Sequence, residues 1–434
     1  MKSRILLQLS MVFLIAVFLT SCSGKKQSIA EEPTNKKQQL SFRITWTAYS
    51  GRGEAIHKIV DLYNKKNKDG FEIVLHGGDE DVKAIEGLLA EKSSETIYVL
   101  PYRYVKYFGD KGNLEDLSVS FQKEQELFYP ELWQLGKIND GIYGIPWVGH
   151  SICLIYNKDL LQKAGVDGAS IKSLDSLLQA LEAVEEKTDA KGIGLVGANH
   201  NDISWMVNQF VYGYGSNLVN ASGTKVAINN ENGKAAIAFY KDILGKHAQP
   251  SWVDDTGVEV LEHFRKQEIA FEFQGVWGIA DHEKHGQSFP VGIINLEDIG
   301  LCSEVGPMML SIPSSMEREK KEEAIKFIQF MISKEAQEKI MDGEYSPEHD
   351  TYYPFRVPVR KDLSDSLVFE KYPQYLPFLK GFKRPSVDVP VPKWQNIKDG
   401  YYAPGLHQVM KEELSIDEFL NRIEVEGNKI LIEE

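Results

Sequence analysis

The chain has 434 residues, a formal net charge of −14 and a hydrophobic fraction of 42%. That fraction excludes a disordered chain, and 63 acidic residues against 49 basic ones argue against a nucleic-acid partner, whose phosphates they would repel. Three cysteines exclude a disulfide framework, and the length predicts two or three domains.

The N-terminus has the pattern of an export segment. Lys2 and Arg4 precede an apolar run that extends to Thr20, and Ser21 and Cys22 follow it. This pattern resembles the lipobox of bacterial lipoproteins, in which the cysteine is lipidated and becomes the mature N-terminus. We expect residues 1–21 to be a lipoprotein signal peptide and the polar residues 22–39 to be a flexible tether, anchored to the membrane at Cys22. An uncleaved membrane helix is the alternative, but the run is short of the roughly 20 apolar residues that a span requires.

Apolar periodicity in the first part of the chain predicts strands that alternate with helices. Alternating apolar residues predict strands at 42–46 and 71–75, and a continuous apolar run at 97–100 is typical of a strand buried on both faces. Helical spacing predicts helices at 56–63 and 82–89 between them. The order β-α-β-α-β predicts an α/β fold.

The same alternation continues to the C-terminus. It predicts strands at 151–156, 192–196, 269–273 and 308–312, and helices at 174–181, 237–244, 324–331 and 415–430. Ser173 is expected to cap the first of these helices, and Ser415 with Glu418 forms a capping-box pattern at the last. The proline-rich segment 384–392 is expected to be a loop.

Motifs of catalysis do not appear in the sequence. It contains no phosphate-binding loop of the G-x-x-x-x-G-K-[ST] type and no G-x-S-x-G nucleophile elbow. These absences argue against the corresponding enzyme classes. Acidic residues are abundant, so a glycan-acting enzyme with a pair of carboxyl groups remains an alternative.

Four segments carry a family resemblance. They are GIYGIPW at 141–147 with YNKDL at 156–160 and AGV at 164–166, the segment 264–277 from FRKQEIA to QGVW, KKEEAIKFIQFMISKEAQ at 320–337, and the helix at 415–430. In this order they resemble the bacterial extracellular solute-binding proteins of ABC importers, of the sugar-type, maltose-binding-protein-like group. The resemblance extends from about residue 40 to the C-terminus.

The resemblance implies a periplasmic-binding-protein-like fold of type II, in which crossing hinge segments join two α/β lobes with a ligand cleft between them. It implies an N-terminal lobe of residues 40–148 and 306–344, and a C-terminal lobe of residues 149–305 and 345–434. It implies a binding protein, which we expect to have no enzymatic activity, cofactor or metal. The implied partners are a small-molecule ligand, expected to be a saccharide, and the permease subunits of an ABC importer. We expect a monomer outside the cytoplasm.

Candidate ligand-binding residues follow the predicted strands, because ligands of α/β sheets bind beyond the carboxyl ends of the strands. Aromatic rings cover the apolar face of a sugar, and polar side chains pair with its hydroxyl groups. The candidates are Tyr49, Arg52, Tyr102, Arg103, Tyr104, Trp147, His150, Asn201, Asp202, Trp205, Trp277, Tyr353 and Trp394.

Each candidate also has a structural interpretation. The aromatic residues could belong to the core, His150 could be a structural histidine, and Arg52 and Arg103 could form surface ion pairs. Trp46, within a predicted strand, is expected in the core. The stretch 281–307 departs from the family pattern, so no cleft residue is assigned near Glu304.

Other ligands and roles remain alternatives. A phosphate ester would need Arg52 or Arg103 in the cleft, and a polyamine is a further possibility. Tyr352 and Tyr353 are similar to the adjacent tyrosines of ferric-ion receptors. A sensory receptor of the same fold is also compatible with the sequence, while the acidic net charge disfavours a strongly anionic substrate.

Overall fold

The computed structural model describes residues 37–46, 52–78, 82–90, 95–346, 350–354 and 356–432. The expected signal peptide, Cys22 and Tyr49 lie outside the described residues. Residues from Lys37 to the C-terminus belong to one unit. Within the described ranges, no helix combines the length and the apolar character needed to cross a membrane.

A six-stranded sheet is built mainly from the first part of the chain. Its order is β15-β6-β12-β3-β1-β2, where β1 is parallel to β2 and β3, and β12 is antiparallel to β3 and β6. The strands are β1 (Gln38–Arg43), β2 (Phe71–His76), β3 (Thr96–Pro101), β6 (Ile145–Gly149), β12 (Met308–Ser311) and β15 (Val357–Pro358). β15 pairs with β6 although its residues fall in the range that we expected for the C-terminal lobe.

A four-stranded sheet follows in the chain, with the order β10-β7-β9-β8. β8 and β9 are parallel, and β7 pairs antiparallel with both β9 and β10. The strands are β7 (Cys153–Asn157), β8 (Lys191–Gly194), β9 (Ile269–Gln274) and β10 (Val291–Asn295). Two mixed sheets with interspersed helices confirm the expected α/β class.

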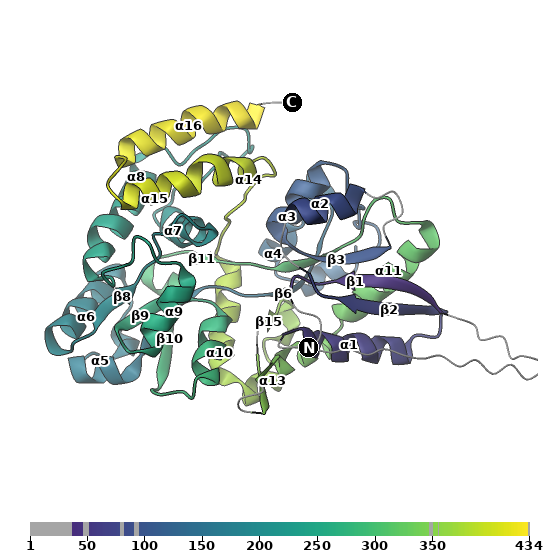
Figure 1. Ribbon diagram of the computed structural model, residues 1–434, viewed down its shortest axis with the longest axis horizontal. Coiled ribbons are helices and arrows are strands. Elements are labelled where there is room, and N and C mark those ends of the chain that lie inside the picture. The colour runs from purple at the N-terminus through teal and green to yellow at the C-terminus, as the bar shows by residue number, and fades with distance from the viewer. Residues whose placement is uncertain are drawn as a thin grey trace, which may run out of the picture. The chain divides into compact units, whose positions relative to one another are not determined.

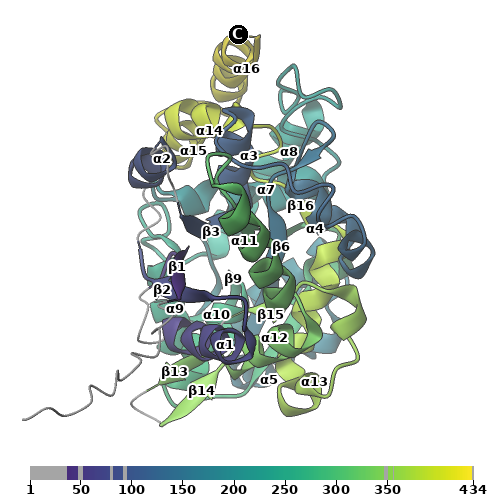
Figure 2. The same cartoon turned by 90° about the vertical axis from the view of Figure 1, so that its right-hand side faces the viewer.

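Helices separate the strands and cover the sheets. Figure 1 shows α1 beside β2, and α5, α6 and α9 around the four-stranded sheet, while α14, α15 and α16 pack together near the C-terminus in Figure 2. The helices are α1 (Arg52–Lys66), α2 (Val82–Ala90), α3 (Tyr102–Asp110), α4 (Pro130–Leu135), α5 (Lys158–Ala164), α6 (Leu174–Lys187), α7 (Asn201–Gly213), α8 (Glu231–Ala238), α9 (Gly257–Arg265), α10 (Val276–Lys284), α11 (Arg318–Met331), α12 (Lys334–Lys339), α13 (Val368–Lys371), α14 (Trp394–Ile397), α15 (Ala403–Met410) and α16 (Ile416–Ile432). The remaining strands are β4 (Lys137–Ile138), β5 (Gly141–Ile142), β11 (Ser303–Glu304), β13 (Glu344–Ser346), β14 (Thr351–Tyr353) and β16 (Pro385–Ser386).

Two short segments carry the chain between the sheets. The residues between β6 and β7 lead from the six-stranded to the four-stranded sheet, and those between β11 and β12 lead back. Ser151 in the first segment forms an antiparallel bridge with Val305 in the second. The two connections therefore run side by side.

Aromatic residues fill the core beside each sheet. Phe42 of β1 packs edge-on against Trp147 of β6 and Phe327 of α11, with ring centres 5.9 and 5.0 Å apart. Beside the other sheet, Phe210 of α7 packs edge-on against Phe273 of β9 at 5.6 Å. Edge-to-face packing of this kind is favourable beyond the apolar area that it buries.

Several predicted boundaries differ from those observed. β1 ends at Arg43, so Trp46 lies beyond the strand instead of within it. Helix α7 and strand β10 were not among the predicted elements. Both predicted caps are confirmed: Ser173 caps α6 in a capping box, and Ser415 Oγ accepts from the backbone N–H of Glu418, whose carboxylate accepts from the backbone N–H of Ser415.

Candidate ligand-binding site

A cavity of about 270 Å³ is lined by residues that follow strands of both sheets. Ligand sites of α/β proteins lie at such positions because the loops after the strands converge there. The lining residues are Arg52, Pro101, Tyr102, Arg103, His150, Asn201, Asp202, Trp205, Trp277, Glu304, Gly306, Pro307, Met308, Arg356 and Asp388.

Helices α1 and α3 supply residues from the side of the six-stranded sheet. Arg52 is the first residue of α1. Helix α3 begins directly after β3, with Pro101 at its N-cap position and Tyr102 and Arg103 as its first residues. Because the chain changes from strand to helix without a loop, these side chains are fixed at the carboxyl end of the sheet.

Helices α7 and α10 supply residues from the side of the four-stranded sheet. Asn201 and Asp202 open α7, and Trp205 lies about one turn further along the same helix. Trp277 is the second residue of α10, which begins after β9 with Gly275 at its N-cap position. A Cβ atom on Gly275 would lie 2.3 Å from Cζ3 of Trp277, so the position of the indole requires glycine there.

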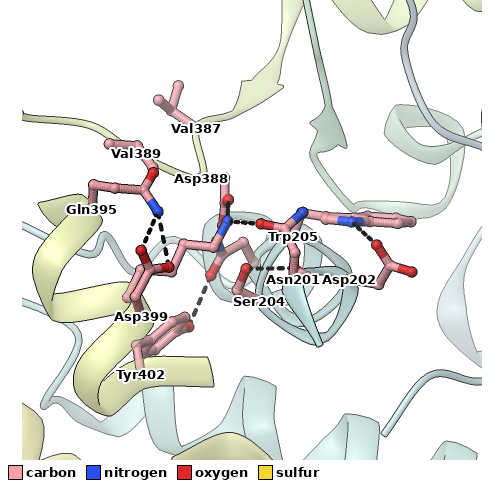
Figure 3. Close-up of polar contacts among 12 residues, drawn as sticks. Asn201, Asp202, Ser204, Trp205, Val387, Asp388, Val389, Gln395, Asp399 and Tyr402 are labelled. Carbon is pink, nitrogen blue, oxygen red and sulfur yellow. Dashed lines mark hydrogen bonds and ion pairs between the residues drawn. The ribbon is translucent and has the colours of Figure 1, made fainter. Parts of the chain in front are cut away.

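Two tryptophans of this second group are held by hydrogen bonds. Trp277 Nε1 donates to Gln274 Oε1 at 2.5 Å. Trp205 Nε1 donates to Asp202 Oδ1 at 3.1 Å, as Figure 3 shows. Both indoles thus have their polar atom satisfied within the protein. Their ring faces are left for packing against other groups.

Arginine side chains stack with the aromatic residues on one side of the cavity. The guanidinium carbon of Arg356 lies 5.1 Å from the centre of a Trp277 ring and 5.8 Å from that of Trp46. The guanidinium carbon of Arg52 lies 6.0 Å from the Trp46 ring centre. These distances are within the range of cation–π attraction. Trp46 therefore contacts two arginines of the lining in addition to packing against the core.

His150 occupies the segment that connects the two sheets. Its ring packs edge-on against Trp277 with ring centres 4.7 Å apart, and a Cβ on Gly306 would lie 2.1 Å from its Cε1 atom. Burial lowers the pKa of His150 well below its ordinary value, and the positive charges of Arg356 and Arg52 lower it further. The imidazole is therefore neutral at physiological pH. Among the described residues, its Nδ1 atom has no hydrogen-bond partner.

A network around Asp388 closes the other side of the cavity. Lys398 donates to Asp388 Oδ2 and to Asn201 Oδ1, the latter at 2.5 Å, and Asn208 Nδ2 donates to Asp388 Oδ1 at 2.9 Å (Figure 3). The hydroxyl of Tyr102 accepts from the backbone N–H of Asp388 at 2.8 Å. The network therefore joins α3 to α7 and to the segment before α14.

The pKa values of two carboxyl groups in the cavity are shifted in opposite directions. Burial raises the pKa of Glu304 well above its ordinary value, and the nearby charge of Asp388 adds to the effect, while the charges of Lys398 and Arg103 oppose it. Burial alone would also raise the pKa of Asp202, but hydrogen bonds from His200, Gly257 and Trp205 hold it below its ordinary value. Asp202 is therefore ionised, and His200 lies beside it at 3.1 Å.

Eight of the predicted residues line this cavity: Arg52, Tyr102, Arg103, His150, Asn201, Asp202, Trp205 and Trp277. Trp147 and Trp394 instead belong to the core and are fully buried. Trp147 points from β6 toward Phe42, and Trp394 packs edge-on against Tyr402 at 5.6 Å. Trp147 follows a predicted strand and Trp394 was expected in a loop, and these positions predicted that both line the ligand cleft. Apolar neighbours enclose both rings instead.

Two further predicted residues lie elsewhere. Tyr104 is on α3 but is not among the lining residues, and its ring packs against Phe108 at 6.2 Å and beneath the guanidinium of Arg103 at 4.8 Å. Tyr353 lines a second cavity of about 740 Å³. Tyr352 lines it too, and its hydroxyl donates to Glu54 at 2.7 Å and accepts from Lys58.

Three charged lining residues were not among the predicted ones. Glu304 lies in the stretch that departs from the family pattern, and Asp388 lies in the proline-rich loop. Arg356 follows the tyrosine pair by a few residues and is brought to the cavity as the chain approaches β15. Of these three residues, only Asp388 had a signal in the sequence, because it is a charged residue within a proline-rich segment.

The chain matches the family model described as bacterial extracellular solute-binding protein over residues 58–377, more than half of its length. It is 25% identical to the arabinooligosaccharide-binding protein of Bacillus subtilis over 252 residues, which cover 56% of this chain and 55% of the relative. It is 22% identical to the maltodextrin-binding protein of the same organism over 275 residues, 62% of each chain. The matches thus span less than two thirds of these curated relatives.

Solved structures show the same fold. An ABC transporter solute-binding protein from Thermotoga lettingae, bound with α-D-tagatose, has a TM-score of 0.75 at 20% sequence identity, covering 91% of this chain and 100% of that one. The expected periplasmic-binding-protein-like fold of type II, with two α/β lobes, is confirmed.

Proposed function

The chain belongs to the family of bacterial extracellular solute-binding proteins, and we propose that it is the saccharide-binding component of an ABC importer. It would capture a sugar or oligosaccharide in the cavity beside Trp277 and deliver it to the permease subunits. Curated relatives that bind arabinooligosaccharide and maltodextrin support a saccharide as the ligand.

The observation that carries the proposal is the composition of the cavity. Trp205 and Trp277 line it together with Asn201, Asp202 and Tyr102. Indole faces pack on the apolar face of a sugar ring, and amide, carboxylate and hydroxyl groups pair with its hydroxyls.

Ligand capture would proceed by closure of two lobes about the paired connections at Ser151 and Val305. Short crossing segments can absorb the change in backbone angles that hinge bending requires. A ligand that touches Arg103 on one lobe and Trp277 on the other favours the closed state by its contacts to both.

The carboxyl groups of the cavity must also be considered for the alternative that the chain is a glycan-acting enzyme. Glycosidases use a general acid together with a carboxylate that acts as nucleophile or base. Both oxygens of Asp388 accept hydrogen bonds, from Asn208 and Lys398, which supports a structural role. Because the family model describes solute-binding proteins, we propose binding without turnover.

Calorimetric titration of the mature chain with mono- and oligosaccharides tests the proposal. We expect at least one saccharide to bind and to raise the melting temperature, and Trp277→Ala to weaken that binding. If a polyamine, a metal ion or a non-sugar phosphate ester binds and no saccharide does, the proposal is wrong.

We further propose that Cys22 carries the lipid anchor. Metabolic labelling with a fatty acid should mark the wild-type protein and leave Cys22→Ala unlabelled, with the variant released from the membrane fraction. Equal labelling of both proteins would contradict this assignment. Cys302→Ala serves as the matched control, because that thiol belongs to the folded part of the chain.

A further inference from the structure

We propose that the ligand is an oligosaccharide that begins beside Trp277 and extends into the second cavity, where Tyr353 and Tyr372 bind its further units. The inference rests on the proposed saccharide-binding function and specifies the size of the ligand and the place of these further units. The position, the volume and the side chains of the second cavity support it.

One face of helix α1 lines both cavities. Arg52 belongs to the first cavity, and Ala55, Ile59 and Leu62 belong to the second. Residues three or four positions apart lie on the same face of a helix, so these side chains follow one another along α1. Arg52 and Leu62 are about 15 Å apart along the helix axis, at about 1.5 Å per residue. A single sugar ring is too short to reach both, whereas a chain of sugar units extends from one to the other.

Two further segments also pass from one cavity to the other. Helix α10 contributes Trp277 to the first cavity and Glu283 to the second, and the chain from β14 to β15 contributes Arg356 to the first and Tyr353 to the second. Helix α10 contacts β14, and α1 contacts β13, the strand that pairs with β14 (Figure 2). All three segments thus line both cavities, which places the cavities next to each other.

The volumes of the cavities favour a ligand of more than one unit. Ligand pockets typically measure roughly 300–1,000 Å³. The first cavity, of about 270 Å³, is smaller than that, whereas the second, of about 740 Å³, lies within the range. The first cavity therefore suits one end of a saccharide. A longer saccharide that is held beside Trp277 leaves this cavity, and the second cavity is the adjacent space.

Tyrosine side chains supply the second cavity with aromatic surface. Tyr353 and Tyr372 line it and are half-buried, so part of each side chain is accessible. Tyr372 packs edge-on against Tyr375 with ring centres 6.1 Å apart, which holds it in the wall. Aromatic rings pack on the apolar face of a sugar, as the indoles do in the proposed function. The second cavity therefore repeats the aromatic character of the first.

Tyr352 fixes the wall of the second cavity. Its hydroxyl donates to Glu54 at 2.7 Å and accepts from Lys58, whose ammonium nitrogen lies 4.0 Å from the centre of the ring. Its ring also packs against Tyr345 with ring centres 5.1 Å apart. These contacts tie β14 to α1, so Tyr353, the next residue of the strand, is held at the cavity.

Gln374 supplies polar atoms for sugar hydroxyls. Its Nε2 atom donates to Glu283 Oε1 at 2.5 Å, and the hydroxyl of Tyr375 donates to Glu283 Oε2 at 2.9 Å. These bonds join α10 to the segment that follows α13 and fix the orientation of the amide. A primary amide also has a second N–H and a carbonyl oxygen, which pair with the hydroxyl groups of a sugar unit.

The test is a calorimetric titration of the mature chain with saccharides of increasing length. The probes are series of one to four units of α-1,4-linked glucose, α-1,5-linked arabinose and β-1,4-linked xylose, the first two chosen after the maltodextrin and arabinooligosaccharide of the relatives. We expect the affinity within at least one series to rise about tenfold or more from the monosaccharide to the tetrasaccharide, because further units contact the second cavity.

Variants connect this length dependence to the second cavity. Tyr353→Ala and Tyr372→Ala should each weaken binding of the tetrasaccharide about tenfold and that of the monosaccharide less. Trp277→Ala should weaken binding of every member of the series. Tyr401→Ala is the matched control and should change no affinity, since Tyr401 is a half-buried tyrosine that lines neither cavity. Circular dichroism is recorded for each variant. Because the two tyrosines of the cavity belong to different segments, a variant that does not fold leaves the other as the test.

The outcomes separate this inference from the proposed function. A monosaccharide that binds as tightly as the longer members of its series would overturn the inference and leave saccharide binding in place. A length dependence that the folded Tyr353→Ala and Tyr372→Ala variants retain in full would also overturn it. If no saccharide of any length binds, both the inference and the proposed function are wrong.

Discussion

Arg356 and Trp277 connect the two sheets, with the guanidinium carbon 5.1 Å from the centre of an indole ring. Arg356 precedes β15 at the edge of the six-stranded sheet, and Trp277 follows β9 of the four-stranded one. His150, from the segment between the sheets, packs edge-on against the same indole. Trp277 therefore contacts both a residue beside the six-stranded sheet and a residue of the segment that connects the two sheets.

Replacing Trp277 by alanine should weaken saccharide binding by more than about 1 kcal/mol, because an aromatic stacking partner of the sugar is lost. The melting temperature should change little, since the indole is only partly buried. Calorimetric titration measures the effect. Trp277→Phe keeps an aromatic face and should retain most of the affinity. Unchanged affinity in Trp277→Ala would place this residue outside the binding site.

The buried pair of Lys398 and Asp388 predicts a large effect on stability. Their side chains are 1% and 6% exposed, so removal of the cation in Lys398→Met leaves an uncompensated buried carboxylate. We expect a loss of about 3–5 kcal/mol in the free energy of unfolding, measured with urea. The double variant Lys398→Met, Asp388→Asn should recover part of the loss. A single variant as stable as the wild type would contradict the assignment of a buried ion pair.

Glu272 in β9 predicts a pH dependence of stability. It is fully buried, and neither of its carboxyl oxygens has a hydrogen-bond partner in the described part of the chain. Burial, followed by the charge of Asp281, raises its pKa well above 4.5. The folded state therefore binds the proton more tightly than the unfolded state. Its contribution to stability is fully present below the unfolded pKa and is lost as pH rises through the folded pKa.

Glu272→Gln removes this titration. The variant should gain stability relative to the wild type as pH rises above 4.5, by about 1.4 kcal/mol per pH unit until the folded pKa is reached. Urea unfolding at about pH 5 and about pH 8 measures the difference. Glu126→Gln, at an exposed position, controls for the loss of one charge. A difference that is equal at both pH values would contradict a raised pKa.

The capping box of α16 predicts a smaller effect. Ser415 Oγ accepts from the backbone N–H of Glu418 at 3.2 Å, and Glu418 Oε2 accepts from the backbone N–H of Ser415 at 3.1 Å. Ser415→Ala should lower the free energy of unfolding by about 1 kcal/mol, because one cap is lost. Ser415→Asp, which retains an acceptor, should restore most of it. Equal stability of the alanine variant would show that the box contributes little.

Local sequence patterns correctly predicted the strands and caps whose position depends on residues within the same segment. The strands at 71–75, 97–100 and 269–273 and the caps at Ser173 and Ser415 are set by alternation or by a side chain two or three positions away. The first strand was placed too late because alternation continues to Trp46, although the ladder with β2 ends at Arg43. The C-terminal end of that strand is set by its pairing with β2 and cannot be read from the segment's own residues.

The candidate site was predictable where it follows strands and helix starts. Arg52, Tyr102, Asn201 and Trp277 lie at such positions, which the α/β pattern reveals. Arg356 and Asp388 reach the cavity through irregular segments whose path depends on tertiary packing, as when Tyr102 accepts from the backbone N–H of Asp388. Glu304 is placed by β11, a strand of two residues that carries no periodicity.

A crystal structure of the mature chain with a saccharide selected by calorimetry tests the central claim most directly. We predict that the sugar lies between Trp277 and Arg103, in contact with residues that follow strands of both sheets. A saccharide bound at another surface, with this cavity left unchanged, would contradict the proposed function.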